Sequence, residues 1–211
     1  LSHYIYKKFG NEKIEKNSII INLSGSAGQS LGAFSIKGLK LNVIGDANDY
    51  VGKGLSGATI VIKPPEESNL VSDKNTIIGN TVLYGATSGK LFAAGQSGER
   101  FAVRNSGALA VIEGCDSNGC EYMTGGSVVI LGKVGDNFGA GMTGGMAFVY
   151  DPLNEFDMYV NPSSVIWQNV ETTYWKNFLE NLIKEHLQET SSKTAGKILE
   201  NFDEEYKNFK Q

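Results

Sequence analysis

Two stretches of the chain carry the glycine spacing of a dinucleotide-binding loop. The pattern G-x-G-x-x-G occurs at residues 52–57 and again at residues 139–144. Such a loop holds a pyrophosphate where it follows a strand and opens a helix, because the N-terminus of a helix attracts anions. Each copy here runs instead into an apolar, strand-like segment, at 58–62 and at 146–150. We interpret these glycines as corners of the backbone and predict that no nucleotide cofactor binds there.

Histidine and cysteine, the side chains most often used to ligate metals or to activate a nucleophile, are rare. The histidines are His3 and His186, and the cysteines are Cys115 and Cys120. Their spacing matches no metal-ligand motif, and neither histidine lies in the glycine-rich segment where it could activate a serine. The sequence therefore predicts no catalytic residue and no metal site, with both cysteines reduced.

Charged residues gather near two of the glycine corners. Asp46 and Asp49 precede the corner at Gly52, and Arg100 and Arg104 lie in a later corner. Carboxylates and guanidinium groups at this density could bind a ligand, or they could form hydrogen bonds and salt bridges within the corner. A third interpretation is contact with another domain, because arginine is enriched at protein interfaces. We favour the interface and assign Asp46, Asp49, Arg100 and Arg104 to it.

The overall charge and hydropathy exclude two classes of partner. The chain has 23 acidic and 19 basic residues, a formal charge of −4, and no basic stripe of the kind that binds nucleic acid. No apolar run approaches the ~20 residues that span a bilayer, and no leader of basic and then apolar residues is present. These features predict a cytoplasmic protein with no nucleic-acid or membrane partner; a plastid fits equally if the source is eukaryotic.

The elements that must position these residues follow from a repeat. Glycines 89, 107, 126 and 145 are separated by 18, 19 and 19 residues, and each is followed by a short apolar run. Earlier copies begin at glycines 32 and 57, and a polar insertion at 64–69 lengthens one spacing. A fixed period of this length indicates a solenoid in which each repeat forms one coil. We predict about six or seven coils.

Glycine is concentrated at the corners of this predicted solenoid, because corners need positive φ or close backbone approach. Short β-branched and aliphatic segments between the corners are typical of strands: 19–23, 39–44, 59–62, 76–78, 81–83, 128–131 and 147–150. The structural corner residues that we assign are Gly28, Gly32, Gly52, Gly54, Gly57, Gly85, Gly89, Gly107, Gly126, Gly141 and Gly145.

Composition divides the chain into three parts. Residues 1–18 are charged and poor in glycine and are expected to form an N-terminal strap. Residues 19–150 form the glycine-rich β-helix. Residues 151–211 contain a linker and then apolar residues at helical spacing, which predicts two amphipathic helices over 171–188 and 192–209, with Ser191 or Ser192 as the N-cap of the second. The start at Leu1 suggests that the chain was cut from a longer protein.

Several long segments resemble one known domain. They are 25–30, 45–57 (GDANDYVGKGLSG), 78–89 (IGNTVLYGATSG), 98–107 (GERFAVRNSG) and 120–126 (CEYMTGG). In this order they are similar to the C-terminal GXGXG domain of the glutamate synthase large (alpha) subunit, and the resemblance covers essentially the whole chain. It implies a right-handed parallel β-helix, which agrees with the repeat.

The resemblance also implies a parent enzyme of ammonia assimilation. Glutamate synthase hydrolyses glutamine in an amidotransferase domain and passes ammonia to an FMN-bearing barrel, where 2-oxoglutarate becomes glutamate. FMN and an iron–sulfur cluster serve the barrel, with electrons from NADPH, NADH or ferredoxin. In the family this domain is structural, so the resemblance implies a noncatalytic role beside the amidotransferase and FMN-barrel domains, joined in cis or as separate subunits.

Two other functions remain as alternatives at this point. A β-helix subunit of a formylmethanofuran-dehydrogenase-like complex shares the glycine-repeat domain. A carbohydrate-active β-helix enzyme is disfavoured, because the acidic residues cluster at corners and in the tail instead of lining one groove. A homo-oligomer of the isolated chain is also left open, since a face made for another domain can self-associate.

Overall fold

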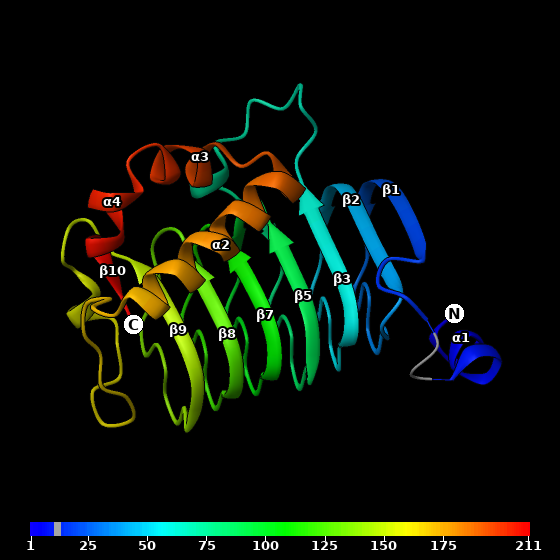
Figure 1. The fold of residues 1–211 in the computed structure, drawn as a ribbon, viewed down its shortest axis with the longest axis horizontal. Coiled ribbons are helices and arrows are strands. Elements are labelled where there is room, and N and C mark those ends of the chain that lie inside the picture. The colour runs from blue at the N-terminus through cyan, green and yellow to red at the C-terminus, as the bar shows by residue number, and fades with distance from the viewer. Residues whose placement is uncertain (11–13) are drawn as a thin grey trace.

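Parallel strands stacked in chain order form one long face of the molecule (Figure 1). In this computed structural model, which describes residues 1–10 and 14–211, an eight-stranded sheet has seven parallel members and one antiparallel strand at its end. The parallel members are β1 (Ile19–Ala27), β2 (Leu39–Ala47), β3 (Ser56–Lys63), β5 (Ser88–Ala93), β7 (Ser106–Ile112), β8 (Thr124–Ile130) and β9 (Gly144–Tyr150). The prediction of a parallel β-helix of about six or seven coils is confirmed, with seven parallel strands in the sheet.

A second, shorter pairing lies on another side of the coils. β4 (Thr76–Ile78) pairs in parallel with β6 (Gln96–Ser97), and the 3₁₀ helix η1 (Ser72–Lys74) precedes β4. The polar insertion at 64–69 lies in the loop between β3 and η1, which projects beyond the coils at the top of Figure 1. The insertion therefore lengthens one coil, while residues 59–62 of β3 still pair continuously with residues 90–93 of β5.

The C-terminal halves of β3, β5, β7 and β8 are apolar on both faces because both faces are buried there, whereas β1 and β2 bury only part of their residues. In β3, Ile60 and Ile62 point into the solenoid, whereas Val61 points outward to a second hydrophobic cluster. The same alternation continues in register through β5, β7 and β8, since Ile60 pairs with Leu91 and Val61 with Phe92. Buried apolar surface contributes roughly 25 cal/mol per Å², so these ladders supply the main driving force for stacking.

One corner of each coil has an unusual backbone. Immediately before β3, Tyr50, Gly52 and Gly54 have φ values of 61°, 65° and 62°, so every second residue is left-handed. Each of these three residues donates its N–H to a neighbouring coil; Gly52, for example, donates to the carbonyl of Leu31 at 2.9 Å. The equivalent triplets in other coils are Ser30, Gly32 and Phe34; Thr81, Leu83 and Gly85; Arg100, Ala102 and Arg104; Asn118, Cys120 and Tyr122; and Asn137, Gly139 and Gly141.

This corner overturns one expected strand. The segment 81–83 was predicted to be extended from its Thr-Val-Leu composition, but Thr81 and Leu83 are left-handed with φ of 58° and 60°. The Leu83 N–H donates to the Val51 carbonyl at 2.8 Å. A left-handed conformation costs a non-glycine residue roughly 1–2 kcal/mol, so the coil-to-coil hydrogen bonds and the burial of Leu83 override local preference.

Gly85→Ala is expected to destabilise the chain by about 1 kcal/mol. Gly85 has φ of 63°, and a Cβ added there would meet nothing within 4 Å, so the cost is backbone strain alone. Chemical denaturation measures it. Gly28→Ala is the matched control, because Gly28 is exposed, lies outside the left-handed region and has equally free space. Equal stability of the two variants would contradict the strain argument.

The C-terminal segment crosses the outer face of the strands (Figure 1). α2 (Thr173–Thr190) packs Leu179, Leu182 and Ile183 into the outer cluster over β3, β5 and β7. The second predicted helix is shorter than expected and is divided into α3 (Lys193–Glu200), α4 (Phe202–Glu205) and the 3₁₀ helix η3 (Tyr206–Asn208). Helical geometry breaks at Asn201, with φ −135° and ψ 46°, and β10 (Phe209–Lys210) then pairs antiparallel with β9.

The N-terminal segment begins with α1 (Ser2–Phe9), which lies beyond β1 in Figure 1. Ile5 is its buried residue, and Ile14 is buried against the solenoid as well. Residues 11–13 of the predicted strap lie outside the described residues. Within the part that the structure describes, no helix combines the length and the apolarity needed to cross a bilayer.

Candidate functional site

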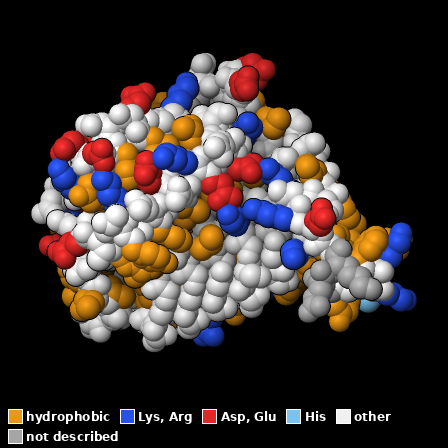
Figure 2. All heavy atoms as spheres, in the orientation of Figure 1, with side chains coloured by type: hydrophobic (Ala, Val, Ile, Leu, Met, Phe, Trp, Pro, Cys, Tyr) orange, Lys and Arg blue, Asp and Glu red, His pale blue; other side chains and the backbone are white. Residues whose placement is uncertain are grey.

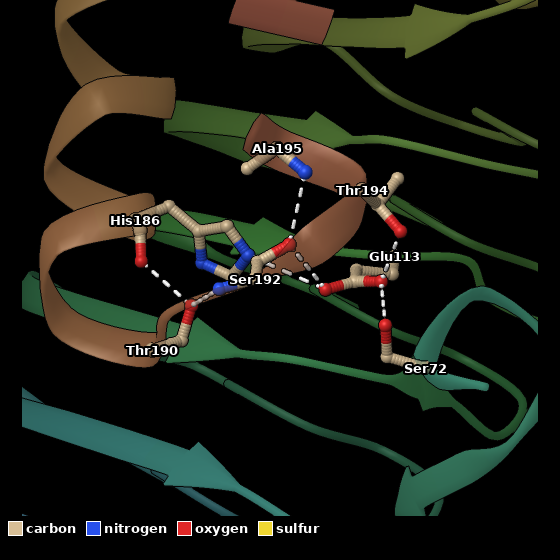
Figure 3. Close-up of polar contacts among 7 residues, drawn as sticks. All are labelled: Ser72, Glu113, His186, Thr190, Ser192, Thr194 and Ala195. Atoms are coloured by element: carbon tan, nitrogen blue, oxygen red, sulfur yellow. Dashed lines mark hydrogen bonds and ion pairs between the residues drawn. The ribbon is translucent and has the colours of Figure 1, made fainter. Parts of the chain in front are cut away.

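A buried carboxylate lies where the helical tail meets the solenoid. Glu113 directly follows β7, and its backbone N–H donates to the carbonyl of Gly95 in the preceding coil at 3.0 Å. Its side chain is fully buried and points toward the junction of α2 and α3 (Figure 3). A buried charge is costly unless it is hydrogen-bonded, so the partners of Glu113 decide its role.

Three hydroxyl groups from two other segments donate to Glu113. Ser192 Oγ donates to Oε1 at 2.7 Å, while Thr194 Oγ1 and Ser72 Oγ donate to Oε2 at 2.7 and 2.6 Å (Figure 3). Ser72 belongs to η1, Ser192 is the N-cap of α3, and Thr194 lies in its first turn. The carboxylate therefore joins the insertion loop, the end of β7 and the start of α3.

His186 is the nearest titratable side chain, and it is neutral near pH 7. Its Nε2 lies 3.7 Å from Glu113 Oε1, and among the described residues neither ring nitrogen has a hydrogen-bond partner. Burial lowers the pKa of His186 below its usual value despite the attraction of Glu113. Burial would raise the pKa of the Glu113 carboxyl, but the His186 ring and the three hydroxyls together lower it below its usual value. The cluster thus holds an ionised carboxylate beside an uncharged imidazole.

The residue types of this cluster match a hydrolytic triad, but the geometry does not. In a triad the histidine accepts the proton of the serine hydroxyl. Here Ser192 Oγ donates to the carboxylate and accepts the N–H of Ala195 at 2.9 Å. Glu113, His186 and Ser192 are also buried, so a substrate has no access to them. This arrangement does not activate a nucleophile. Its hydrogen bonds hold the helical tail against the solenoid.

Ser192→Ala is expected to destabilise the chain by about 2 kcal/mol, because it removes both the N-cap of α3 and a charge-assisted hydrogen bond. Thermal unfolding of the purified chain measures the loss. Thr172→Ala is the matched control: Thr172 caps α2 by accepting the N–H of Trp175 at 3.3 Å but lies on the exposed surface. We expect Thr172→Ala, which removes a cap alone, to lower the free energy of unfolding by about 0.5–1 kcal/mol. Equal losses would show that the Glu113 contact adds nothing.

Ion pairs run along the line where α2 lies on the strands. Lys40 of β2 pairs with Glu189 at 2.5 Å, and Lys90 of β5 pairs with Glu185 at 2.5 Å. Figure 2 shows acidic and basic side chains gathered beside the C-terminal end of α2. Partly exposed pairs of this kind contribute up to about 1 kcal/mol each, so they align α2 more than they anchor it.

The structure separates the four predicted interface residues. Asp49 Oδ1 accepts the backbone N–H of Asn80 at 2.8 Å, whereas Arg100 Nε lies 3.3 Å from Glu121. Arg104 lies over the ring of Tyr122 at 5.6 Å, and Asp46 is exposed at the end of β2. These contacts link adjacent coils, and they do not bring the aspartates to the arginines.

The predicted corner glycines occupy three kinds of position. Gly32, Gly52, Gly54, Gly85 and Gly141 are left-handed residues of the corner, with φ of 62–67°. Four others lie near the starts of strands with φ of 83–119°: Gly57, Gly89, Gly126 and Gly145. The remaining two, Gly28 and Gly107, have φ outside the left-handed region. Both G-x-G-x-x-G copies lead into strands, β3 and β9, as their sequence context indicated.

Metal-ligating side chains do not converge. Among residues 1–10 and 14–211, no group of three or more His, Cys, Asp or Glu side chains is placed to hold a metal ion. Cys115 and Cys120 are free and buried. Burial raises the pKa of the Cys115 thiol to about 12, so it carries no thiolate near neutral pH.

Sequence reasoning missed Glu113. The one sequence feature that could have indicated it is an acidic residue directly after the apolar run 109–112, in a segment expected to be buried. The hydroxyl partners lie 41, 79 and 81 residues away, so nothing local indicates that they converge. Only the path of the tail across the outer face brings these segments together.

Comparison with known proteins gives a consistent family. The model of the GXGXG motif family matches residues 1–211. The NADPH glutamate synthase large chain of Azospirillum brasilense is 61% identical over 211 residues, covering 100% of this chain and 14% of the relative. The NADH glutamate synthase of Schizosaccharomyces pombe is 52% identical over 202 residues, which are 96% of this chain and 10% of the relative. Ferredoxin-dependent glutamate synthase 2 of Synechocystis is 48% identical over 204 residues, which are 97% of this chain and 13% of the relative.

Proposed function

The chain belongs to the GXGXG motif family, and we propose that it is a noncatalytic structural domain of a glutamate synthase. The observation that carries the proposal is the identity of 61% over the whole chain to a segment that makes up 14% of a named glutamate synthase large chain. The chain thus spans about a seventh or less of the relatives described above. The reaction proposed for the complete enzyme converts glutamine, 2-oxoglutarate and a reductant into two molecules of glutamate.

The structure supports a scaffolding role through the way its polar groups are used. The buried carboxylate of Glu113 is engaged by three hydroxyls within the chain, and the corner side chains contact adjacent coils. A stack of coils around one continuous hydrophobic core is stiff and offers long surfaces. Such a body suits the role of organising other domains at fixed positions.

The proposed partners are the amidotransferase and FMN-barrel domains of the same enzyme, joined in cis or as separate subunits. FMN and an iron–sulfur cluster are assigned to those domains and not to this chain. The relatives are named for NADPH, NADH and ferredoxin, so the electron donor is left unassigned. A cytoplasmic or plastid location is proposed on the same basis.

We retain the three-part division into strap (1–18), β-helix (19–150) and tail (151–211) as a proposal, together with the interface assignment of Asp46, Asp49, Arg100 and Arg104. In the structure the tail is joined to the β-helix by the outer hydrophobic cluster and Glu113. The formylmethanofuran-dehydrogenase alternative receives no support, since the matched relatives described here are all named glutamate synthases.

The experiment compares the isolated chain with the complete protein that contains it. Each is supplied with glutamine, 2-oxoglutarate and each of the three reductants in turn, and glutamate is measured. We expect glutamate from the complete protein and none from the isolated chain. Turnover by the isolated chain would overturn the scaffold role, and a complete protein inactive with every donor would overturn the assignment to glutamate synthase.

A further inference from the structure

The last parallel strand has an edge that is only partly covered. β9 pairs with β8 on one side, but on the other side β10 pairs with Tyr150 and Val149. The backbone of residues 144–148 therefore has no strand partner on that side in the described chain. Unpaired strand edges readily accept another strand, and this edge lies at the C-terminal end of the row in Figure 1.

The chain after β9 begins a further coil but does not complete it. Val160 bridges Phe138 in parallel, and the Asn161 amide donates to Asn137 Oδ1 at 2.7 Å, continuing the corner onto the next level. Ser164 Oγ accepts the N–H of Gly141 at 2.9 Å. In the earlier coils this corner leads into a strand, but the segment after Ser164 continues to Gln168, which exchanges backbone hydrogen bonds with Gln211. The additional coil has a corner without a strand.

A hollow of about 660 Å³ occupies the place of that strand. Its floor includes Met146 and Ala147 of β9, and its walls include Phe138, Val165 and Trp167. Ile166 stands at the rim with its side chain 96% exposed. Lys210 also lines the hollow, where its ammonium group donates to the amide oxygens of Asn154 and Asn169, and no acidic side chain is among the described lining residues.

We propose that this hollow is a strand-addition site, filled in the complete protein by an extended segment of the large chain from outside residues 1–211. The added backbone pairs with the free edge of β9, and alternate apolar side chains enter the hollow, as in other cases of strand addition. Lys210 favours an acidic residue near one end of that segment and disfavours basic ones. The inference rests on the proposed function, which places this chain within a longer enzyme.

Two observations favour the rest of the large chain over a second copy. The A. brasilense relative has most of its length outside the matched segment, which covers 14% of it. A tethered segment binds at high effective concentration, so even a short strand can be held. A second copy stacked head to tail would present its edge at β1, but α1 lies beyond β1 at that end (Figure 1), with Ile5 buried. Stacking of copies would displace this helix.

The test places the photo-crosslinking residue p-benzoylphenylalanine at Ile166 in the complete protein. Crosslinked peptides are mapped by mass spectrometry with a mixture of isotope-labelled and unlabelled protein. We expect one dominant crosslink to a single segment of the same chain outside residues 1–211. Because Ile166 is almost fully exposed, the substitution should not disturb folding. Leu70, which is half-exposed in the insertion loop, is the control position and should give no crosslink to that segment.

Three outcomes would overturn the inference: no crosslink above the control, scattered crosslinks, or a crosslink between labelled and unlabelled copies. Hydrogen exchange in the complete protein is a second readout: peptides covering 144–148 are expected to exchange within about tenfold of the rate of peptides from β7, which is paired on both sides. Exchange more than about tenfold faster than in β7 would contradict strand addition. Neither readout depends on turnover. An active complete protein without the crosslink defeats this inference alone, whereas an inactive one with the crosslink defeats the proposed function alone.

Discussion

Gly107→Ala is expected to destabilise the chain by about 3 kcal/mol or more, the largest effect that we anticipate for a single added methyl group. Gly107 lies near the start of β7 with φ outside the left-handed region, so alanine is acceptable there on backbone grounds. A Cβ would nevertheless overlap the carbonyl oxygen of Thr87 in the preceding coil. A backbone atom cannot move aside as a flexible side chain can, so the two coils must separate locally.

Thermal unfolding measures this effect, and a loss of about 3 kcal/mol corresponds to a fall in Tm of roughly 6–12 °C for a chain of this size. Gly28→Ala supplies the control with free space and no strain, and Gly85→Ala the control with strain alone. The expected order of stability is Gly28→Ala, then Gly85→Ala, then Gly107→Ala. A Gly107→Ala variant as stable as Gly85→Ala would refute the close approach of the coils.

Glu113→Ala is expected to cost about 3 kcal/mol, because it leaves a cavity and orphans the hydroxyls of Ser72, Ser192 and Thr194. Glu113→Gln keeps the shape and part of the hydrogen bonding, so we expect a smaller loss of about 1–2 kcal/mol. Limited proteolysis should then cut first near the junction of α2 and α3, where the tail is released.

The pH dependence of folding stability separates the contribution of the Glu113 charge from that of its packing. Its pKa in the folded chain is lowered below its ordinary value of 4.5. The carboxylate therefore stabilises the fold at pH values above about 4.5, and this contribution is lost as the pH falls through the folded-state pKa. As the pH falls below about 4.5, the stability of Glu113→Gln should decrease less steeply than that of the wild type.

Glu189→Gln is the matched control for this pair of variants. Glu189 lies near the same end of α2 but is partly exposed and pairs with Lys40. We expect a loss below about 1 kcal/mol at neutral pH and an acid profile close to that of the wild type. If Glu189→Gln and Glu113→Gln proved equally costly, the buried cluster would be no more important than a surface ion pair.

The periodic part of the fold could be predicted because its causes are local and repeated. The apolar runs after glycines at steps of 18 and 19 residues indicate coils of fixed length, and the structure has the corresponding strands. The helix over 171–188 followed from its amphipathic spacing and is present as α2, with bounds Thr173–Thr190. Ser192, one of the two predicted N-caps, caps α3.

Other features depended on neighbours that are distant in sequence. The Thr81–Leu83 segment has strand propensity, yet hydrogen bonds to the adjacent coils hold it left-handed. The second tail helix carried a helical pattern to residue 209, yet Phe209 is fully buried in β10 beside Tyr150. In both places contacts with another coil outweigh the local preference, and a single sequence does not report those contacts.

The amino-acid sequence by itself determined the winding, because stacking the coils is the efficient way to bury the aliphatic runs that lie between regularly spaced glycines. It also indicated the family, and the context of the glycines predicted backbone corners in place of a nucleotide loop. The tertiary structure alone decided where the polar groups act. Glu113 acquires its partners across 41–81 residues, and the free edge of β9 exists only because the chain turns away after Ser164. Both depend on which segments lie side by side, and stacking, not local composition, sets that arrangement.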